Sequence, residues 1–290
     1  MKSRIEAIKR SSRRVFRLSA LLIHVALGAA LVKFVYPRAS HELRLAVRAR
    51  WCRKTLRVLG VDLCVVGTVP PGCHLIVANH ISWLDTFAIS AVFPCWYVSK
   101  QETRAWPLLG WMAAANNTLF LRRQSARAAF RMNAEVRKRL ASRQSVAIFP
   151  EGTTTDGTWV RDFYPALFQP AVDHGLTVLP LAISYRDEAA AAATSVAYID
   201  DDPLWKSLAA VLEAPRTEAR LVLDQALDGS TSHRRELAVR TCQAIRRGQS
   251  WSIEPALIEP GTPAASSPAA FTPYAGVVQS RLPGMQPRRA

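Results

Sequence analysis

Two residues separated by five positions, His80 and Asp85, could together carry acid–base chemistry. The apolar run at residues 75–78 predicts an interior strand, and Ser82 predicts the N-cap of a helix whose first turn contains Asp85. If His80 lies in the intervening loop, Asp85 can turn back and bind one nitrogen of its ring. The other ring nitrogen can then accept a proton from a substrate hydroxyl.

The same spacing has an ordinary explanation, because a histidine beside an aspartate is more often a helix cap or a buried polar contact. Neither a serine nor a cysteine is placed by its spacing to act as a nucleophile. If the pair is catalytic, the reaction that fits is attack of the substrate's own hydroxyl on an activated carbonyl.

A second stretch, residues 146–155 (VAIFPEGTTT), also predicts a buried strand that ends in a polar loop. Gly152 allows backbone amides to approach a ligand closely, and successive amides in a tight turn form an anion-binding concavity. In a largely parallel sheet the carboxyl ends of the strands share one edge, where we expect His80, Arg122 and Glu151.

The two stretches together resemble the sequence blocks of the glycerolipid acyltransferase family, of the 1-acylglycerol-3-phosphate acyltransferase type. Residues 79–85 (NHISWLD) match its N-H-x-x-x-x-D block, and residues 149–153 (FPEGT) match its F-P-E-G-T block. Residues 115–122 (ANNTLFLR) and 178–181 (VLPL) resemble two further blocks. The resemblance covers residues 61–223.

The resemblance implies a reaction. His80 would remove a proton from the hydroxyl of a lysolipid, and Asp85 would orient His80. The hydroxyl would attack the thioester carbonyl of acyl-carrier protein or acyl-coenzyme A, which are co-substrates. Neither a cofactor nor a metal is expected.

The resemblance also implies a set of substrate-binding residues. Those expected to bind the head group of the acceptor are Arg122, Glu151, Gly152 and Thr153. Lys100, at the end of a predicted strand, could add a phosphate contact, although a solvated strand end is an equal interpretation. Backbone amides near Gly152 or the side chain of Asn79 would stabilise the oxyanion.

The expected acceptor is 1-acylglycerol-3-phosphate, which would give phosphatidate in phospholipid biosynthesis. Thr154 stands where an arginine often follows the F-P-E-G-T block, which weakens this case, although Arg123 or Arg161 could compensate. A lyso-ornithine lipid or another lysolipid is the alternative acceptor. An alternative of another class is a lipid-binding protein of the membrane surface without turnover, which would not need the His80–Asp85 pair.

The positive charge is concentrated at the start of the chain. Of the net charge of +16, residues 1–60 contribute 15 Lys and Arg against 2 Asp and Glu, which is +13. Apolar residues interrupt these charges, so we expect a contact with an anionic membrane surface and none with nucleic acid.

Residues 18–36 are mostly apolar and are expected to associate with a membrane. Basic residues on both flanks favour a monotopic or re-entrant anchor; a single span and a cleaved signal peptide are the alternatives. The expected location is the inner (cytoplasmic) membrane, with the catalytic domain facing the cytoplasm. Residues 41–59 predict an amphipathic helix with Arg44, Arg48 and Arg57 on its polar side, suited to a membrane surface or to packing on the body.

The rest of the chain predicts an α/β fold: a single domain with a mostly parallel central sheet flanked by helices, preceded by an N-terminal membrane-associated helical segment. We expect residues 1–60 to form the anchoring region, residues 61–252 the catalytic domain, and residues 253–290, rich in Pro and Ala, a disordered tail. The five cysteines show no C-x-x-C spacing, so we expect no disulfide framework.

The predicted strands are residues 61–66, 75–78, 96–99, 118–121, 145–149, 177–184, 195–199 and 220–223. The predicted helices are residues 83–92, 107–115, 125–142, 165–174, 203–212 and 232–247.

Overall fold

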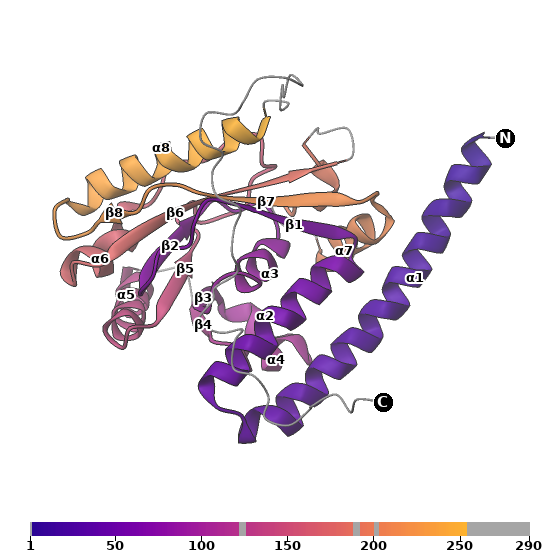
Figure 1. The fold of residues 1–290 in the computed structure, drawn as a ribbon, viewed down its shortest axis with the longest axis horizontal. Helices are drawn as coiled ribbons and strands as arrows, with labels where there is room; N and C mark the ends of the chain where they lie inside the picture. The colour runs from indigo at the N-terminus through magenta and orange to yellow at the C-terminus, as the bar shows by residue number, and fades with distance from the viewer. Residues whose placement is uncertain (1, 122–125, 188–191, 200–202, 254–290) are drawn as a thin grey trace, which may run out of the picture.

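The structure is a computed structural model that describes residues 2–121, 126–187, 192–199 and 203–253. At its centre is an eight-stranded sheet with the order β1-β7-β6-β2-β5-β3-β4 and with β8 paired to β6 (Figure 1). The strands are β1 (Val61–Val66), β2 (His74–Ala78), β3 (Cys95–Lys100), β4 (Thr118–Leu121), β5 (Ser145–Ile148), β6 (Thr177–Arg186), β7 (Thr217–Leu223) and β8 (Leu227–Asp228).

A parallel block of five strands sets the position of the polar loops. Strands β6, β2, β5, β3 and β4 run in one direction, β7 pairs antiparallel with β6, and β1 runs parallel to β7. Because β2, β5 and β3 are parallel neighbours, the loops that follow Ala78, Ile148 and Lys100 leave from the same edge of the sheet. The predicted fold class, a mostly parallel sheet in one α/β domain, is confirmed.

Helices cover both faces of this sheet. One face packs on α2 (His41–Val58), α3 (Leu84–Ser90) and α7 (Leu204–Glu213), and the other on α5 (Ala126–Ala141), α6 (Gln169–Asp173) and α8 (Arg234–Ile253). In β2, Ile76 and Ala78 belong to the first core, whereas Leu75 and Val77 belong to the second. The uninterrupted apolar run of β2 is therefore explained by burial on both faces.

One predicted strand is wrong. Residues 195–199 do not join the sheet; the 3-10 helix η5 (Thr194–Val196) begins just before them. The backbone of this segment is bonded to the loops of the site instead, because the amide of Tyr198 donates to the carbonyl of Ile81 at 2.9 Å and the hydroxyl of Thr154 donates to the carbonyl of Tyr198. The helix predicted over residues 165–174 is also divided, into the 3-10 helix η4 (Pro165–Phe168) and α6.

The N-terminal region consists of two long helices joined by a tight connection. Helix α1 (Lys2–Ala30) continues into the π-helix η1 (Leu31–Val35) and the 3-10 helix η2 (Tyr36–Arg38), and Ser40 caps the start of α2. Helix α2 packs on the body through Cys52 and Leu56. Arg48 is buried as well, and its guanidinium donates to the carbonyl of Asn116 at 3.1 Å. The expectation that Arg48 lies on the polar outer side of this helix is therefore wrong.

Helix α1 has its polar side turned towards the protein. Its buried side chains are Arg17 and His24, and the buried Gly28 allows Trp51 of α2 to approach closely. The guanidinium of Arg17 donates to the carbonyls of Val211 and Ala214 at the end of α7, and His24 bonds to α2. The exposed large apolar side chains of α1 are Ile8, Val15, Phe16, Leu18, Leu22, Ile23 and Leu27.

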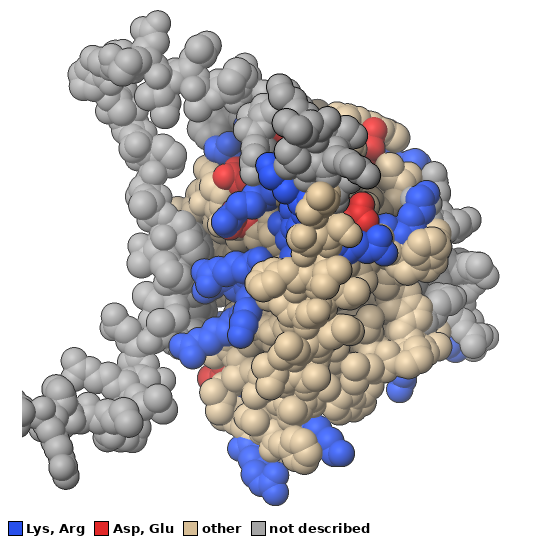
Figure 2. Space-filling model, turned by 90° about the vertical axis from the view of Figure 1, so that its right-hand side faces the viewer, with Lys and Arg blue, Asp and Glu red and all other residues tan. Residues whose placement is uncertain are grey.

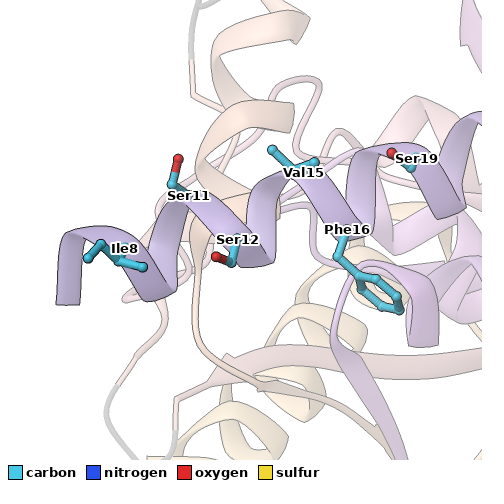
Figure 3. Close-up of a pocket in the computed structure, with 6 residues that line it drawn as sticks. All are labelled: Ile8, Ser11, Ser12, Val15, Phe16 and Ser19. Atoms are coloured by element: carbon cyan, nitrogen blue, oxygen red, sulfur yellow. The ribbon is translucent and has the colours of Figure 1, made fainter. Parts of the chain in front are cut away.

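From Val15 onward the outer side of α1 is thus broadly apolar. Viewed from this side, Lys and Arg side chains gather in the upper part and along the left of the molecule. A wide area without charge lies below and to the right of them, and further Lys or Arg side chains lie at its lower end (Figure 2). The helical stretch Ile8–Arg38 is long and apolar enough to cross a membrane by length and composition. A shallow hollow on α1 is lined by Ile8, Ser11, Ser12, Val15, Phe16 and Ser19 and contains no acid or base (Figure 3).

Candidate active site

The side chains of His80 and Asp85 meet at the edge of the sheet. His80 lies in the loop after β2, and Asp85 is the second residue of α3. His80 Nδ1 lies 2.7 Å from Asp85 Oδ2. Because a carboxylate only accepts hydrogen bonds, this contact places the proton on Nδ1 and leaves Nε2 as the acceptor. The histidine side chain is 17% exposed and the aspartate is fully buried, so only the imidazole ring of this pair is accessible to a substrate.

The local fold holds Asp85 through the backbone as well. Its Oδ2 accepts hydrogen bonds from the amides of Ile81 (2.8 Å) and Ser82 (3.0 Å). The Ser82 hydroxyl in turn accepts from the amide of Leu84 at 3.3 Å. This reciprocal arrangement occupies the donors at the start of α3 and fixes the carboxylate where the loop turns into the helix.

Tyr185 is a member of this cluster that no sequence pattern indicated. It lies in β6, is buried, and donates from its hydroxyl to Asp85 Oδ1 at 2.7 Å. Burial, and then the neighbouring Asp85 carboxylate, raise the pKa of the Tyr185 phenol well above its ordinary value of 10.0. The phenol therefore stays protonated and remains a donor. Its only sequence signal is its place on a buried strand, which does not identify a partner 100 positions away.

The loop after β5 holds His80 from both sides. Glu151 Oε1 accepts from the amide of His80 at 2.7 Å, and the amide of Thr155 donates to the carbonyl of His80 at 2.9 Å. The ring of Phe149 stacks on the imidazole, with the ring centroids 4.0 Å apart and the planes at 14°. The two sequence blocks are thus one structural unit with His80 at its centre.

Glu151 is a link between loops and not an exposed ligand group. Its Oε2 accepts from the amide of Arg161 at 2.9 Å, so both carboxylate oxygens are bonded to backbone amides and the side chain is buried. Burial raises the pKa of the Glu151 carboxyl, while the hydrogen bonds from the amides of Arg161 and His80 oppose this effect. The expectation that Glu151 contacts a head group is not supported by this position.

Asn79 also has a structural role, because its side chain links two strands of the sheet. Its side chain is fully buried; it accepts from the amide of Ile183 at 2.7 Å and donates to the carbonyl of the same residue at 3.0 Å. This pair of bonds links the end of β2 to β6. The side chain of Asn79 is therefore occupied by the backbone of β6, contrary to the expectation that it donates to an oxyanion.

Of the expected substrate-binding residues, Gly152 and Thr153 remain at the surface of the site. Gly152 has a φ of +76°, and its amide donates to the carbonyl of Phe149 at 3.3 Å. Thr153 is half-buried between Gly152 and the buried Thr154. Glu151 and Thr155, on either side of this turn, both bond to the backbone of His80, so the turn lies beside this residue.

The expected cationic ligands are placed only in part. Lys100 ends β3, on the same edge as His80, and nothing is described of its side chain. Arg122 and Arg123 lie outside the described residues. Arg161 is exposed, with its guanidinium 5.1 Å from the centroid of Trp159. Within the described ranges, no three His, Cys, Asp or Glu side chains lie together as a metal site requires.

The acyltransferase family profile matches residues 64–184. A lyso-ornithine lipid O-acyltransferase of Pseudomonas aeruginosa is 35% identical over 240 residues, which cover 81% of this chain and 92% of that protein. The chain belongs to the acyltransferase family. The family predicted from the two sequence blocks is therefore confirmed, and with it the assignment of the protein as an enzyme.

Two further relatives of this acyltransferase are informative. A 1-acyl-sn-glycerol-3-phosphate acyltransferase of Neisseria gonorrhoeae is 35% identical over 190 residues, covering 65% of this chain and 73% of that protein. The crystal structure of the 1-acyl-sn-glycerophosphate acyltransferase of Thermotoga maritima superposes with a TM-score of 0.66 at 21% identity, over 85% of this chain and 97% of that one. The structural likeness shows that the fold is shared.

Proposed function

We propose that this acyltransferase moves a fatty acyl chain from a thioester of acyl-carrier protein or coenzyme A to the free hydroxyl of a lysolipid. The observation that carries the proposal is the 2.7 Å contact between His80 Nδ1 and Asp85, with the rest of the imidazole partly exposed at the edge of the sheet. This geometry suits a general base for an alcohol and requires no nucleophile from the protein.

In the proposed reaction, the acceptor oxygen attacks the thioester carbonyl while its proton passes to His80 Nε2. The tetrahedral intermediate carries its negative charge on the former carbonyl oxygen. When the intermediate collapses, the carbon–sulfur bond breaks, and the imidazolium returns its proton to the departing thiolate. The products are the acylated lipid and the free thiol of the carrier.

The remaining members of the cluster act as positioning residues. Asp85 stabilises the imidazolium and fixes the ring, and Tyr185 and the two loop amides fix Asp85. The backbone amide of Thr153 is the proposed donor to the oxyanion, because the residues on both sides of this turn bond to His80 and the Gly152 amide is already bonded to Phe149. One well-placed donor of this kind lowers the barrier by roughly 3–4 kcal/mol.

For the acceptor, two lysolipids fit the family, and two observations favour the lyso-ornithine class over lysophosphatidate. Thr154 occupies the position where an arginine often follows the F-P-E-G-T block. Its side chain is buried and its hydroxyl donates to the carbonyl of Tyr198, so this position faces the protein. The lyso-ornithine relative also aligns with more of this chain, 81% against 65% for the gonococcal enzyme.

We also propose that α1 lies in one leaflet of the cytoplasmic membrane, with the catalytic body on the cytoplasmic side. Arg14 near the middle of α1 is paired with Glu213 at 2.9 Å, His24 in its last third is bonded to Thr55, and Tyr36 beyond its end donates to Asn116. A helix whose apolar stretch is held to the body from Arg14 to its end cannot cross a bilayer that the body does not cross. The outer apolar side then faces the acyl chains.

The test is acyl transfer from labelled acyl-carrier protein and acyl-coenzyme A to a panel of lysolipids, using membranes that contain the wild type or His80→Ala. We expect the wild type to form more product on lyso-ornithine lipid than on 1-acylglycerol-3-phosphate, and the variant to form none. The general-base role is refuted if a folded, membrane-bound His80→Ala enzyme is as active as the wild type.

A further inference from the structure

A short segment between β3 and β4 exposes four large apolar side chains. The 3-10 helix η3 (Gln101–Ala105) and α4 (Leu109–Ala115) form this connection. We name as the turn patch its exposed large side chains, which are 37–45% exposed: Trp106, Leu108, Leu109 and Trp111. Arg104, also exposed, adds a positive charge at its border. Such a concentration of Trp and Leu at a surface indicates a partner.

The backbone of this segment is built to hold these side chains outward. Leu108 has φ +61° and ψ −55°, and the amide of Leu109 donates to the carbonyl of Pro107 at 2.6 Å. These values describe a γ-turn of the rare positive-φ type, which is strained for a leucine. Gly110 lies so close to η3 that an added Cβ would be 2.3 Å from the carbonyl oxygen of Arg104. The turn is therefore packed tightly from within, although its side chains face out.

The position of the turn patch links it to both the site and the anchor. The connection leaves β3 at the edge of the sheet that carries His80 and Glu151. On its inner side, Met112 of α4 reaches Gly28 of α1, where an added Cβ would be 3.0 Å from the methionine methyl. Helix α4 lies beside the lower halves of α1 and α2 (Figure 1). Exposed Leu27 of α1 and Phe34 of η1 belong to the same end of the anchor.

We infer that the turn patch is a second membrane contact, which inserts into the headgroup region and sets the active-site edge of the sheet against the bilayer. The inference rests on the proposed acylation of a lipid acceptor. Tryptophan is enriched at this depth, because its ring is apolar and its N–H remains hydrated. Continuity with the outer side of α1 and the adjacent Arg104 favour a lipid surface of anionic composition over a protein partner.

The first experiment measures depth. The full chain is bound to vesicles of phosphatidylcholine and phosphatidylglycerol that contain brominated acyl chains, and tryptophan quenching is compared between the wild type and Trp106→Phe/Trp111→Phe. We expect the double variant to lose part of the lipid-quenchable fluorescence. Equal lipid-quenchable fluorescence in both proteins, which is also what a protein-docking patch would give, overturns the inference.

The second experiment uses variants chosen to preserve the fold. Leu108→Gly removes an apolar side chain and suits the positive φ, and Leu109→Ser completes the pair; Val239→Ser on α8 is the matched control on an exposed apolar residue elsewhere. For acceptor presented in vesicles we expect KM to rise about tenfold in Leu108→Gly/Leu109→Ser, from the apolar surface no longer buried. The control should match the wild type, and kcat in detergent should not change.

These outcomes separate the inference from the proposed function. An unchanged vesicle KM in the double variant overturns the membrane contact while leaving acyl transfer intact. A wild type that acylates no lysolipid in detergent refutes the proposed function, and the bromolipid comparison then still decides whether the turn patch enters the bilayer.

Discussion

Tyr185 donates to one carboxylate oxygen of Asp85 at 2.7 Å, and His80 is bonded to the other at the same distance. The buried carboxylate thus joins strand β6 to the loop after β2, because one oxygen accepts from Tyr185 and the other from three consecutive residues of the loop. A carboxylate held in this way has little freedom to leave the imidazole when charge develops there.

Removing the Tyr185 hydroxyl should weaken the cluster without dismantling it. Tyr185→Phe leaves Asp85 Oδ1 buried without this donor, which costs about 1–3 kcal/mol of unfolding free energy. We expect kcat to fall by less than in Asp85→Asn, with KM for the acceptor unchanged, as measured by steady-state kinetics and urea unfolding. Wild-type stability and kcat in the variant would show that the bond has no positioning role.

Replacing the carboxylate itself should have a much larger effect. Asp85→Asn presents an amide where two backbone amides and a phenol already donate, so the histidine loses its orientation and the correct proton on Nδ1. We expect kcat to fall on the order of 10³- to 10⁴-fold. Asp156→Asn is the matched control, because this carboxylate caps only its own loop through Thr158. An Asp85→Asn enzyme with a kcat like that of the control would contradict the assigned role.

The raised pKa of Glu151 predicts that its contribution to stability decreases as pH rises. Because burial raises the pKa of this carboxyl above its ordinary value of 4.5, the folded state holds the proton more tightly than the unfolded state. Its contribution to stability is therefore present at low pH and is lost as pH rises through the raised pKa. The unfolding free energy of the wild type minus that of Glu151→Gln should decline over this range.

The measurement is urea unfolding of both proteins from below the ordinary glutamate pKa of 4.5 upwards to neutral pH, with Glu135→Gln on α5 as control. Glu151→Gln also loses one acceptor for a backbone amide, so kcat should fall even where the protein remains folded. A stability difference that rises with pH would mean that the hydrogen bonds outweigh burial.

Gly152 should not tolerate a side chain. At φ +76° an alanine is strained, and its Cβ would lie 2.9 Å from the ring of Tyr164. Tyr164 is exposed and can move, so the lasting cost is the backbone strain, about 1 kcal/mol. Unfolding of Gly152→Ala, Tyr164→Ser and the double variant should give additive losses. Full rescue by Tyr164→Ser would instead identify the ring contact as the cause.

The sequence predicted the parts of this molecule that depend on local pattern. Strand β4 begins and ends where its apolar run does, and His80 reaches Asp85 because the two are joined by one short loop. Tyr185 could not be found in this way, since only the register of β6 brings it to Asp85. For residues 195–199 the apolar pattern was correct, but the hydrogen-bonding partners are loops.

The burial of polar side chains was the second feature that could not be predicted from the sequence. Glu151 was expected to bind a head group from the resemblance to the family, and Asn79 was a candidate oxyanion donor, whereas their oxygens accept from backbone amides of neighbouring segments. Arg48 was placed outward by helical spacing alone, although the carbonyl of Asn116 holds it inward. Such partners are distant in sequence, and amphipathic periodicity does not contain them.

The inward polar side of α1 makes membrane attachment and folding one event. Carbonyls at the end of α7 receive their hydrogen bonds from Arg17, so the body is incomplete until this helix has docked. Once docked, the helix exposes a large apolar surface, which is unfavourable in water. Exchange of this segment for an unrelated membrane helix would restore attachment but would leave the carbonyls at the end of α7 without the hydrogen-bond donors of Arg17. Synthesis of the protein in the absence of a bilayer should lead to aggregation.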